Sequence, residues 1–238
     1  KFINFFSQGS KGECFSGYFG GRIAIANTLG ETSILLSNRY IGSKKQFPFL
    51  KNYNKKNELA VISIKINSKK VTPISAGHRN PQGLLVNNEN VILSTEHGPR
   101  GGDEINKIIQ GKNYGWPIAS YGENYGSKPG TKNYKKSHVD NGFEEPIYSF
   151  VPSIGISQLI EIPNDFSQQW QNNYFVTSLR NLSLYRVKFD QSFSKILTME
   201  KIRVGKRIRD IAFNKSFNSF FLALENNTGS IGIINIKK

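Results

Sequence analysis

One stretch of the chain, EHGPRGGDEINKIIQGKNYGWP at residues 96–117, concentrates residue types that can present oxygen atoms to a cation. Gly98 tolerates unusual backbone angles and Pro99 has no N–H, so this pair can turn its carbonyl oxygens toward an ion. Calcium accepts such carbonyls together with carboxylates, which makes the stretch a candidate calcium site. The residues alone favour equally a rigid structural loop in which Asp103 and Glu104 bind backbone amides.

A second group of candidates consists of arginines, whose planar guanidinium groups bind carboxylates through two parallel hydrogen bonds. Arg207 and Arg209 lie in RIRD, and their i, i+2 spacing places both on one face of a strand, where both can reach one ligand. The alternative is a solvated basic face, because the chain has 32 Lys and Arg against 17 Asp and Glu.

The elements that position these residues are predicted to be strands. Helix signals are weak, whereas short apolar, β-branched runs recur between turns rich in Asn, Gly and Ser. GLLVNNENVILST is typical of a hairpin with its turn at residues 87–90, and the segment from Arg209 to Ile236 predicts a three-stranded antiparallel meander. Many short strands indicate a sandwich, a barrel or a propeller.

A propeller agrees best with the spacing of the strands. Blade repeats of about 40–45 residues would give about five or six blades in this length. The strand clusters recur at roughly that spacing, near residues 21–36, 58–96, 147–178 and 208–235. Residues 97–147 are long, glycine-rich and poor in strand signals, and a loop of this kind in a compact domain is usually functional.

The composition indicates a folded domain, predicted as one unit over residues 1–238, with 37% hydrophobic and 12% aromatic residues. No apolar run reaches about 18 residues, so no membrane span is predicted. The net charge of +15 would suit a nucleic acid, but the lysines are scattered through polar stretches and no binding motif occurs, so no nucleic-acid partner is predicted. Cys14 is the only cysteine, which excludes an internal disulfide. The missing start Met indicates a fragment or a processed product.

Three consecutive motifs resemble those of the soluble PQQ-dependent aldose sugar dehydrogenases, the glucose/sorbosone dehydrogenase family. They are GHRNPQGL at 77–84, STEHGPRGGDEIN at 94–106 and GKNYGWPIASYGENY at 111–125. Further segments continue the resemblance in the same order, at residues 19–25, 144–157, 170–187 and 207–214. The resemblance covers nearly the whole chain, weakly at 30–75. It implies an all-β, six-bladed β-propeller of which this chain lacks about the first blade.

The resemblance also implies two cofactors, PQQ and Ca2+. Gly98 and Pro99 would donate carbonyl oxygens to the calcium that touches PQQ, while Glu104 and Tyr114 match positions at a second calcium site. Arg79 and Asn80 match the pair near the quinone oxygens, which gives Arg79 a catalytic role as well. The positions matched to cofactor binding are Arg79, Asn80, Arg180, Arg207 and Arg209. At the position of Arg180 the family often has Lys.

The implied function is oxidation of an aldose sugar at C1, with electrons passed to a separate acceptor. The resemblance further implies a periplasmic or secreted protein, and a homodimer is the assembly that it allows. The family uses a histidine to take the proton from the C1 hydroxyl, but Tyr18 stands at that position here. A tyrosine, with a pKa of about 10, is a poor base at neutral pH. His78 and His97 match structural positions, and His138 is expected to be solvated in its polar loop.

The replacement of that histidine by Tyr18 leaves a second function open. A calcium-stabilised propeller without catalytic activity could bind a glycan or a protein partner, because one fold can carry unrelated functions. Turnover that depends on PQQ would favour the dehydrogenase, whereas retained calcium ligands beside a blocked mouth would favour the binding protein.

Overall fold

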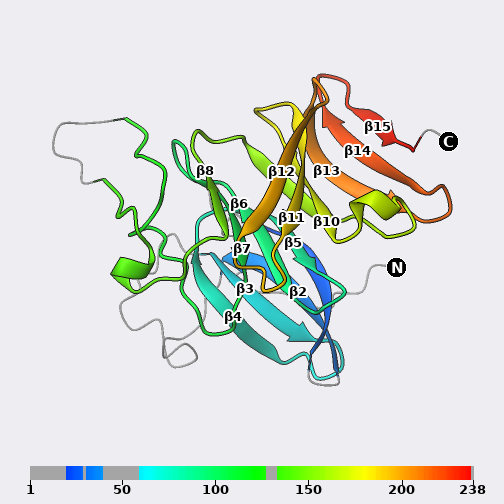
Figure 1. Ribbon diagram of the computed structural model, residues 1–238. Coiled ribbons are helices and arrows are strands. Elements are labelled where there is room, and N and C mark those ends of the chain that lie inside the picture. Colours follow the sequence, from blue (N-terminus) through cyan, green and yellow to red (C-terminus); the bar gives the residue numbers. More distant parts are fainter. Residues whose placement is uncertain (1–19, 29–30, 40–58, 127–132, 237–238) are drawn as a thin grey trace.

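The computed structural model describes residues 20–28, 31–39, 59–126 and 133–236. This part of the chain is almost entirely β-structure, arranged in four antiparallel sheets (Figure 1). Its helical segments are two single 3-10 turns, Val139–Asn141 and Gln168–Trp170. No helix in the described ranges has the length and apolarity needed to cross a membrane. The prediction of an all-β chain is confirmed.

Each sheet is built from strands that follow one another in the chain. The first sheet contains β1 (Ile23–Thr28), β2 (Glu31–Arg39), β3 (Leu59–Lys65) and β4 (Val71–His78). The second contains β5 (Pro81–Val86), β6 (Ile92–Glu96), β7 (Asp103–Lys107) and β8 (Tyr148–Phe150). The third contains β9 (Ile156–Glu161), β10 (Asn173–Ser178), β11 (Ser183–Phe189) and β12 (Ile196–Arg203). The fourth contains β13 (Arg207–Asn214), β14 (Ser219–Glu225) and β15 (Ser230–Ile234).

Three apolar clusters fill the spaces between neighbouring sheets, so the sheets pack face to face. Leu35 and Val61 of the first sheet meet Leu84 of the second. Between the second and third sheets the cluster includes Leu93, Ile105, Leu159 and Val176. Between the third and fourth it includes Phe175, Ile208, Phe220 and Leu222. Alternating side chains of each strand face these clusters, as a pleated strand requires.

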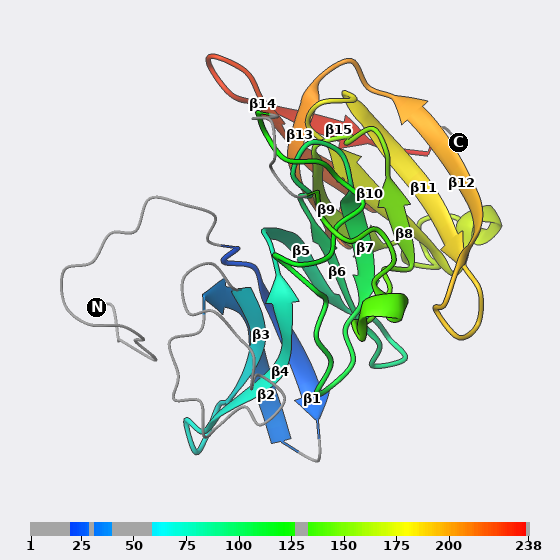
Figure 2. The same cartoon turned by 90° about the vertical axis from the view of Figure 1, so that its left-hand side faces the viewer.

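The first strands of the four sheets, β1, β5, β9 and β13, lie next to one another in that order, with the later strands of each sheet farther out (Figure 2). This is the arrangement of propeller blades. Antiparallel up-and-down order brings two kinds of connection to one end of the sheets: those that lead into a first strand and those that join second and third strands. Four such connections, at residues 79–80, 97–102, 151–155 and 179–182, carry candidate site residues.

Two local predictions are confirmed and the blade count is not. β5 and β6 form the predicted hairpin, in which the Asn87 Oδ1 accepts the N–H of Glu89 at 3.0 Å and of Val91 at 2.8 Å. The meander is β13–β14–β15. The described residues form four sheets, whereas the spacing predicted five or six blades. The β2–β3 and β7–β8 connections are long, so each of the first two sheets uses more of the chain than the assumed blade repeat. The predicted cluster at 58–96 also straddles two sheets.

Candidate functional site

A cleft of about 310 Å³ opens at the end where these connections meet. Its size lies in the range of ligand pockets, about 300–1,000 Å³. Three of its lining side chains, Arg79, Arg100 and Arg180, are cationic, and one, Asp103, is acidic. The cleft therefore suits a ligand with several negative charges. It brings together five of the predicted site residues: Arg79, Asn80, Gly98, Pro99 and Arg180.

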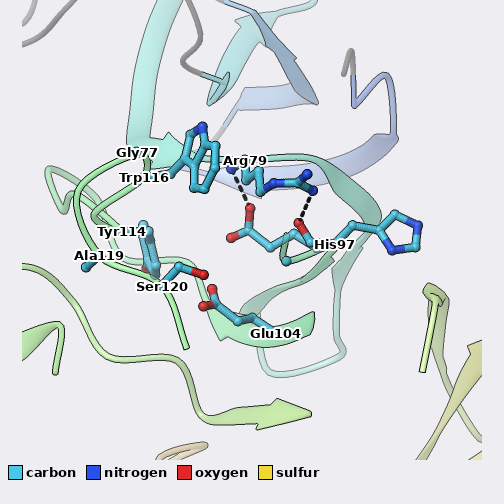
Figure 3. A pocket seen from close by; sticks show the side chains of 10 residues that line it. Gly77, Arg79, His97, Glu104, Tyr114, Trp116, Ala119 and Ser120 are labelled. Atoms are coloured by element: carbon cyan, nitrogen blue, oxygen red, sulfur yellow. Dashed lines mark hydrogen bonds between the residues drawn. The ribbon is translucent and has the colours of Figure 1, made fainter. Parts of the chain in front are cut away.

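Arg79 is held at both its backbone and its side chain. Its N–H donates to Glu96 Oε2 at 2.7 Å, and its Nη1 donates to the carbonyl oxygen of His97 at 2.9 Å (Figure 3). The guanidinium carbon also lies 5.2 Å from the centre of the Trp116 ring, a cation–π distance. Arg79 is therefore fixed between the β4–β5 connection, the β6–β7 loop and Trp116.

The Gly98–Pro99 turn is tightly packed. Gly98 needs to be glycine for space, since a Cβ there would lie 2.1 Å from the carbonyl oxygen of Gly102. Its backbone is not left-handed; Gly101 and Gly102 instead have positive φ angles, 92° and 70°. Within the described residues, no backbone N–H donates to the carbonyl oxygens of Gly98 and Pro99. Both residues line the cleft, so these carbonyls fit the oxygen donors that a calcium ion accepts.

Asp103 anchors this turn to the connection between β8 and β9. Its Oδ1 accepts the N–H of Gly98 at 3.1 Å and the hydroxyl of Ser153 at 2.9 Å, and its Oδ2 accepts the N–H of Ile156 at 2.9 Å. Burial would raise the pKa of Asp103, but His97 and the Ile156 N–H outweigh burial and lower it. The carboxylate stays ionised and keeps all three hydrogen bonds.

A second cavity, of about 10 Å³, adjoins the cleft and shares Arg79, His97 and Gly98 with it. Such a volume holds about one water molecule or one ion. Figure 3 shows Glu104, Tyr114 and Ser120 around the same space as Arg79 and Trp116, while the His97 ring points away from it. The two predicted second-calcium residues, Glu104 and Tyr114, therefore lie together.

Glu104 is a buried carboxylate with little compensation. Asn106 Nδ2 lies 3.3 Å from its Oε2, and His138 Nε2 lies 3.7 Å from its Oε1. Burial raises the pKa of Glu104 well above its usual value, and the charge of Glu96 raises it further. Asn106 Oδ1 is also buried without a hydrogen-bond partner. A cation in the small cavity, which Glu104 lines, would compensate the charge of this carboxylate.

Tyr114 could serve such a cation only through its backbone carbonyl. Its hydroxyl donates to the carbonyl oxygen of Lys107 and accepts the N–H of Ile109 at 3.0 Å, so it is already used in the β7–β8 connection. Among the described residues no group of three or more His, Cys, Asp or Glu could hold a metal ion. An ion here would depend largely on carbonyl oxygens, which suits calcium better than transition metals.

The family model "Glucose / Sorbosone dehydrogenase" matches residues 64–233. The chain belongs to the glucose/sorbosone dehydrogenase family. The predicted resemblance is thereby confirmed.

Two curated relatives with assigned names are similar to this family member. Aldose sugar dehydrogenase YliI of Escherichia coli (strain K12) is 37% identical over 141 residues, which cover 58% of this chain and 37% of that protein. Quinoprotein glucose dehydrogenase B of Acinetobacter calcoaceticus is 33% identical over 107 residues, which cover 44% of this chain and 21% of that protein. The match thus spans well under half of either relative.

Two solved structures also resemble this family member closely. A crystal structure of glucose dehydrogenase aligns with a TM-score of 0.71 at 27% identity, covering 92% of this chain and 64% of that one. The apo-form of the soluble aldose sugar dehydrogenase from Escherichia coli aligns with a TM-score of 0.67 at 28% identity, covering 90% and 63%. These likenesses confirm the β-propeller fold.

Arg207 and Arg209, predicted for cofactor binding in this family, do not line the cleft. The prediction that they share a strand face is confirmed, because both reach Glu225 on β14. Arg207 Nε donates to Glu225 Oε1 at 3.0 Å, and Arg209 Nη2 contacts Oε2. They sit at the beginning of β13, at the same end of the sheets as the cleft. Their contact with a cofactor stays a prediction.

The histidines fall into three environments. His78 is fully buried, as a structural position requires, and stacks on Tyr114 with ring centres 4.5 Å apart. His97 lines the cleft, with Nδ1 3.7 Å from Asp103 Oδ1. The expectation that His138 is solvated is wrong: it is 1% exposed, and burial lowers its pKa despite Glu145 nearby. Tyr18 lies outside the described residues.

Several residues of the site were not predicted. Arg100 follows Pro99 directly, and Tyr125 ends the third family motif, so both could have been found from their motif positions. Glu96 and Asn106, which hold Arg79 and Glu104, also lie in a family motif, at residues 94–106, but the motif does not show what they contact. Their importance depends on how β6 pairs with β7, which the sequence does not reveal.

Proposed function

We propose that this chain belongs to a PQQ- and calcium-dependent dehydrogenase that oxidises aldose sugars at C1 and passes the electrons to a separate acceptor. The observation that carries the proposal is the cleft, where a cationic lining meets two carbonyl oxygens that accept no backbone hydrogen bond from the described residues. PQQ carries three carboxylates and a quinone, and calcium seeks hard oxygen donors. Family membership supports the same assignment.

In this proposal the residues of the cleft bind and orient the cofactor. When bound, PQQ supplies the quinone that accepts the two electrons of the oxidation. Arg79 and Asn80 would hold its quinone end, and Arg180 would bind a carboxylate. Both arginines suit these roles because a guanidinium group carries a permanent positive charge. Arg79 is suited to this role because Glu96, His97 and Trp116 already fix its position, so little entropy is lost on binding.

Calcium belongs at two places in this proposal. Gly98 and Pro99 offer their carbonyl oxygens to an ion in the cleft, while Glu104 and the carbonyl of Tyr114 offer oxygens in the small cavity. Asp103 holds the Gly98–Pro99 turn without itself being needed as a ligand. Tyr18 stands at the sequence position predicted for the proton acceptor.

The test uses the full-length protein, prepared without metal and cofactor and then supplied with calcium and PQQ. We expect aldose-dependent reduction of an acceptor dye only when both are present, and weaker PQQ binding in Arg79→Met than in Arg186→Met, whose arginine lies on β11 away from the cleft. Tyr18→Phe reports whether Tyr18 takes part. PQQ binding without turnover on any aldose would favour the non-catalytic propeller instead.

Location and assembly are separate parts of the proposal. We expect a periplasmic or secreted protein, which fractionation of the source cells would establish. A homodimer would appear as a doubled mass in light scattering of the purified full-length protein.

A further inference from the structure

Arg22 makes contacts that join three of the four sheets. It follows Gly20 and Gly21, both with positive φ, and its N–H and carbonyl bond to Ser37 of β2 at 3.0 and 2.9 Å. A side chain at Gly20 would place its Cβ 2.8 Å from the carbonyl oxygen of Ser37, so this turn requires glycine there. The turn therefore fixes where the Arg22 side chain begins.

The side chain extends from the first sheet to the second and the fourth. Its Nε donates to the carbonyl oxygen of Gln82 on β5. Its Nη1 lies 2.8 Å from Asp210 Oδ2, and its Nη2 lies 3.4 Å from the carbonyl oxygen of Arg209, both on β13. The sequence separation of Arg22 and Asp210 is 188 residues.

Both ends of this connection meet predicted cofactor residues. Gln82 Nε2 donates to Asn80 Oδ1 at 2.9 Å, and Asn80 lines the cleft. On the other side, Arg209 sits at a register shift of β13, between Ile208 and Asp210. Its carbonyl oxygen accepts hydrogen bonds from Ser157 and Arg22. Arg22 thus connects Asn80, which lines the cleft, with Arg209, which is predicted to bind the cofactor.

We propose that Arg22 is a positioning residue that sets the spacing between these two parts of the cofactor site, acting through Gln82 on one side and Asp210 on the other. It would not touch the cofactor itself. Its effect on cofactor binding rests on the proposed function, whereas its effect on the Asn80 amide does not.

Arg22→Met removes every donor of the side chain and keeps much of its length. The matched control is Arg186→Met, because Arg186 pairs with Glu200 at 2.8 Å and its side chain is 24% exposed, against 23% for Arg22. Side-chain amide signals of Asn80 and Gln82 are measured by 15N–1H correlation in the full-length protein. PQQ affinity is measured by titration, with thermal unfolding alongside.

We expect Arg22→Met to shift both amide signals and to weaken PQQ binding about tenfold, the effect of losing one or two hydrogen bonds that orient a ligand group. Asp210→Asn should produce part of the same change, and the control should produce neither. Arg22→Met spectra and affinity matching the control would overturn the proposal. If the wild type binds no PQQ, the proposed function fails, and the amide signals alone decide whether Arg22 positions Asn80.

Discussion

Glu96 on β6 and Glu104 on β7 lie directly opposite each other across a strand pair, but their surroundings differ. Glu96 accepts hydrogen bonds from the Arg79 N–H and from Asn106 Nδ2 at 2.7 Å each, and lies 3.1 Å from His78 Nδ1. Burial would raise its pKa, but His78 and the Arg79 N–H lower it. Glu104 has the weaker contact with Asn106, and its pKa is raised.

The difference separates a structural carboxylate from one suited to a ligand. Like charges directly opposite in a sheet destabilise it, and burial increases that cost. At Glu96 the protein supplies its own donors, so the negative charge is already compensated. At Glu104 it does not, and the adjoining cavity offers room for about one ion. The pair thus predicts opposite responses to removal of each charge.

The largest effect should follow from Glu96→Gln. An amide can accept at one oxygen only, and its NH2 group would face either the Arg79 N–H or the Asn106 amide, donor against donor. Breaking a buried, hydrogen-bonded charge in this way should lower the free energy of unfolding by about 3 kcal/mol. Urea denaturation measures the change.

The control for this variant is Glu89→Gln, in the exposed turn between β5 and β6. It should change the free energy of unfolding by no more than about 0.5 kcal/mol. If Glu96→Gln were as mild as the control, the compensated state assigned to Glu96 would be wrong.

Glu104→Gln should have the opposite sign when calcium is absent. The amide removes an uncompensated buried charge, so the metal-depleted protein should become more stable by on the order of 1–2 kcal/mol. Calcium should then stabilise the wild type, by about 2.7 kcal/mol at one hundred times its dissociation constant, and the variant much less. Thermal unfolding with and without calcium measures both effects. An equal calcium response in the two proteins would show that Glu104 is not a ligand.

The pH dependence of the metal-depleted protein sharpens the same comparison. The pKa of Glu104 is raised in the folded state above its ordinary value of 4.5, so the folded state binds the proton more tightly than the unfolded state does. Stability linked to this group is therefore full below about pH 4.5 and is lost as the pH rises through the folded-state pKa. Wild type and Glu104→Gln should have similar stability near the acid end and diverge toward neutral pH. A difference that stays constant with pH would contradict the assignment.

Much of the fold could be predicted because it depends on local patterns. The Asn-rich turn of the β5–β6 hairpin and the final meander follow from short-range signals in the sequence. The i, i+2 spacing of Arg207 and Arg209 correctly placed them on one face. Their partner Glu225 could not be predicted, since it depends on the register between β13 and β14.

The candidate site divides in the same way. Gly98, Pro99 and Arg79 belong to continuous motifs, and the cleft brings them together. Glu96 and Glu104 face each other because of the register between β6 and β7. Their separation of eight residues in the sequence does not specify this register. His138 was assigned wrongly for a related reason: its own neighbours are polar, but Tyr121, with ring centres 5.2 Å apart, and Glu145 pack against it.

The smallest effect on stability is expected at Glu225, a carboxylate that is compensated like Glu96 but exposed. Hydrogen bonds from Arg209, then Arg207, lower its pKa, yet its side chain is 37% exposed. Solvent screens such a pair, so Glu225→Gln should change the free energy of unfolding by less than about 1 kcal/mol. Its effect on ligand binding should be more visible. If Arg207 and Arg209 bind a cofactor carboxylate as predicted, removing the competing charge should tighten PQQ binding a few-fold, most clearly at low salt, where the arginines are screened least. Unchanged affinity at low salt would indicate that the two arginines serve β13–β14 pairing and not the cofactor.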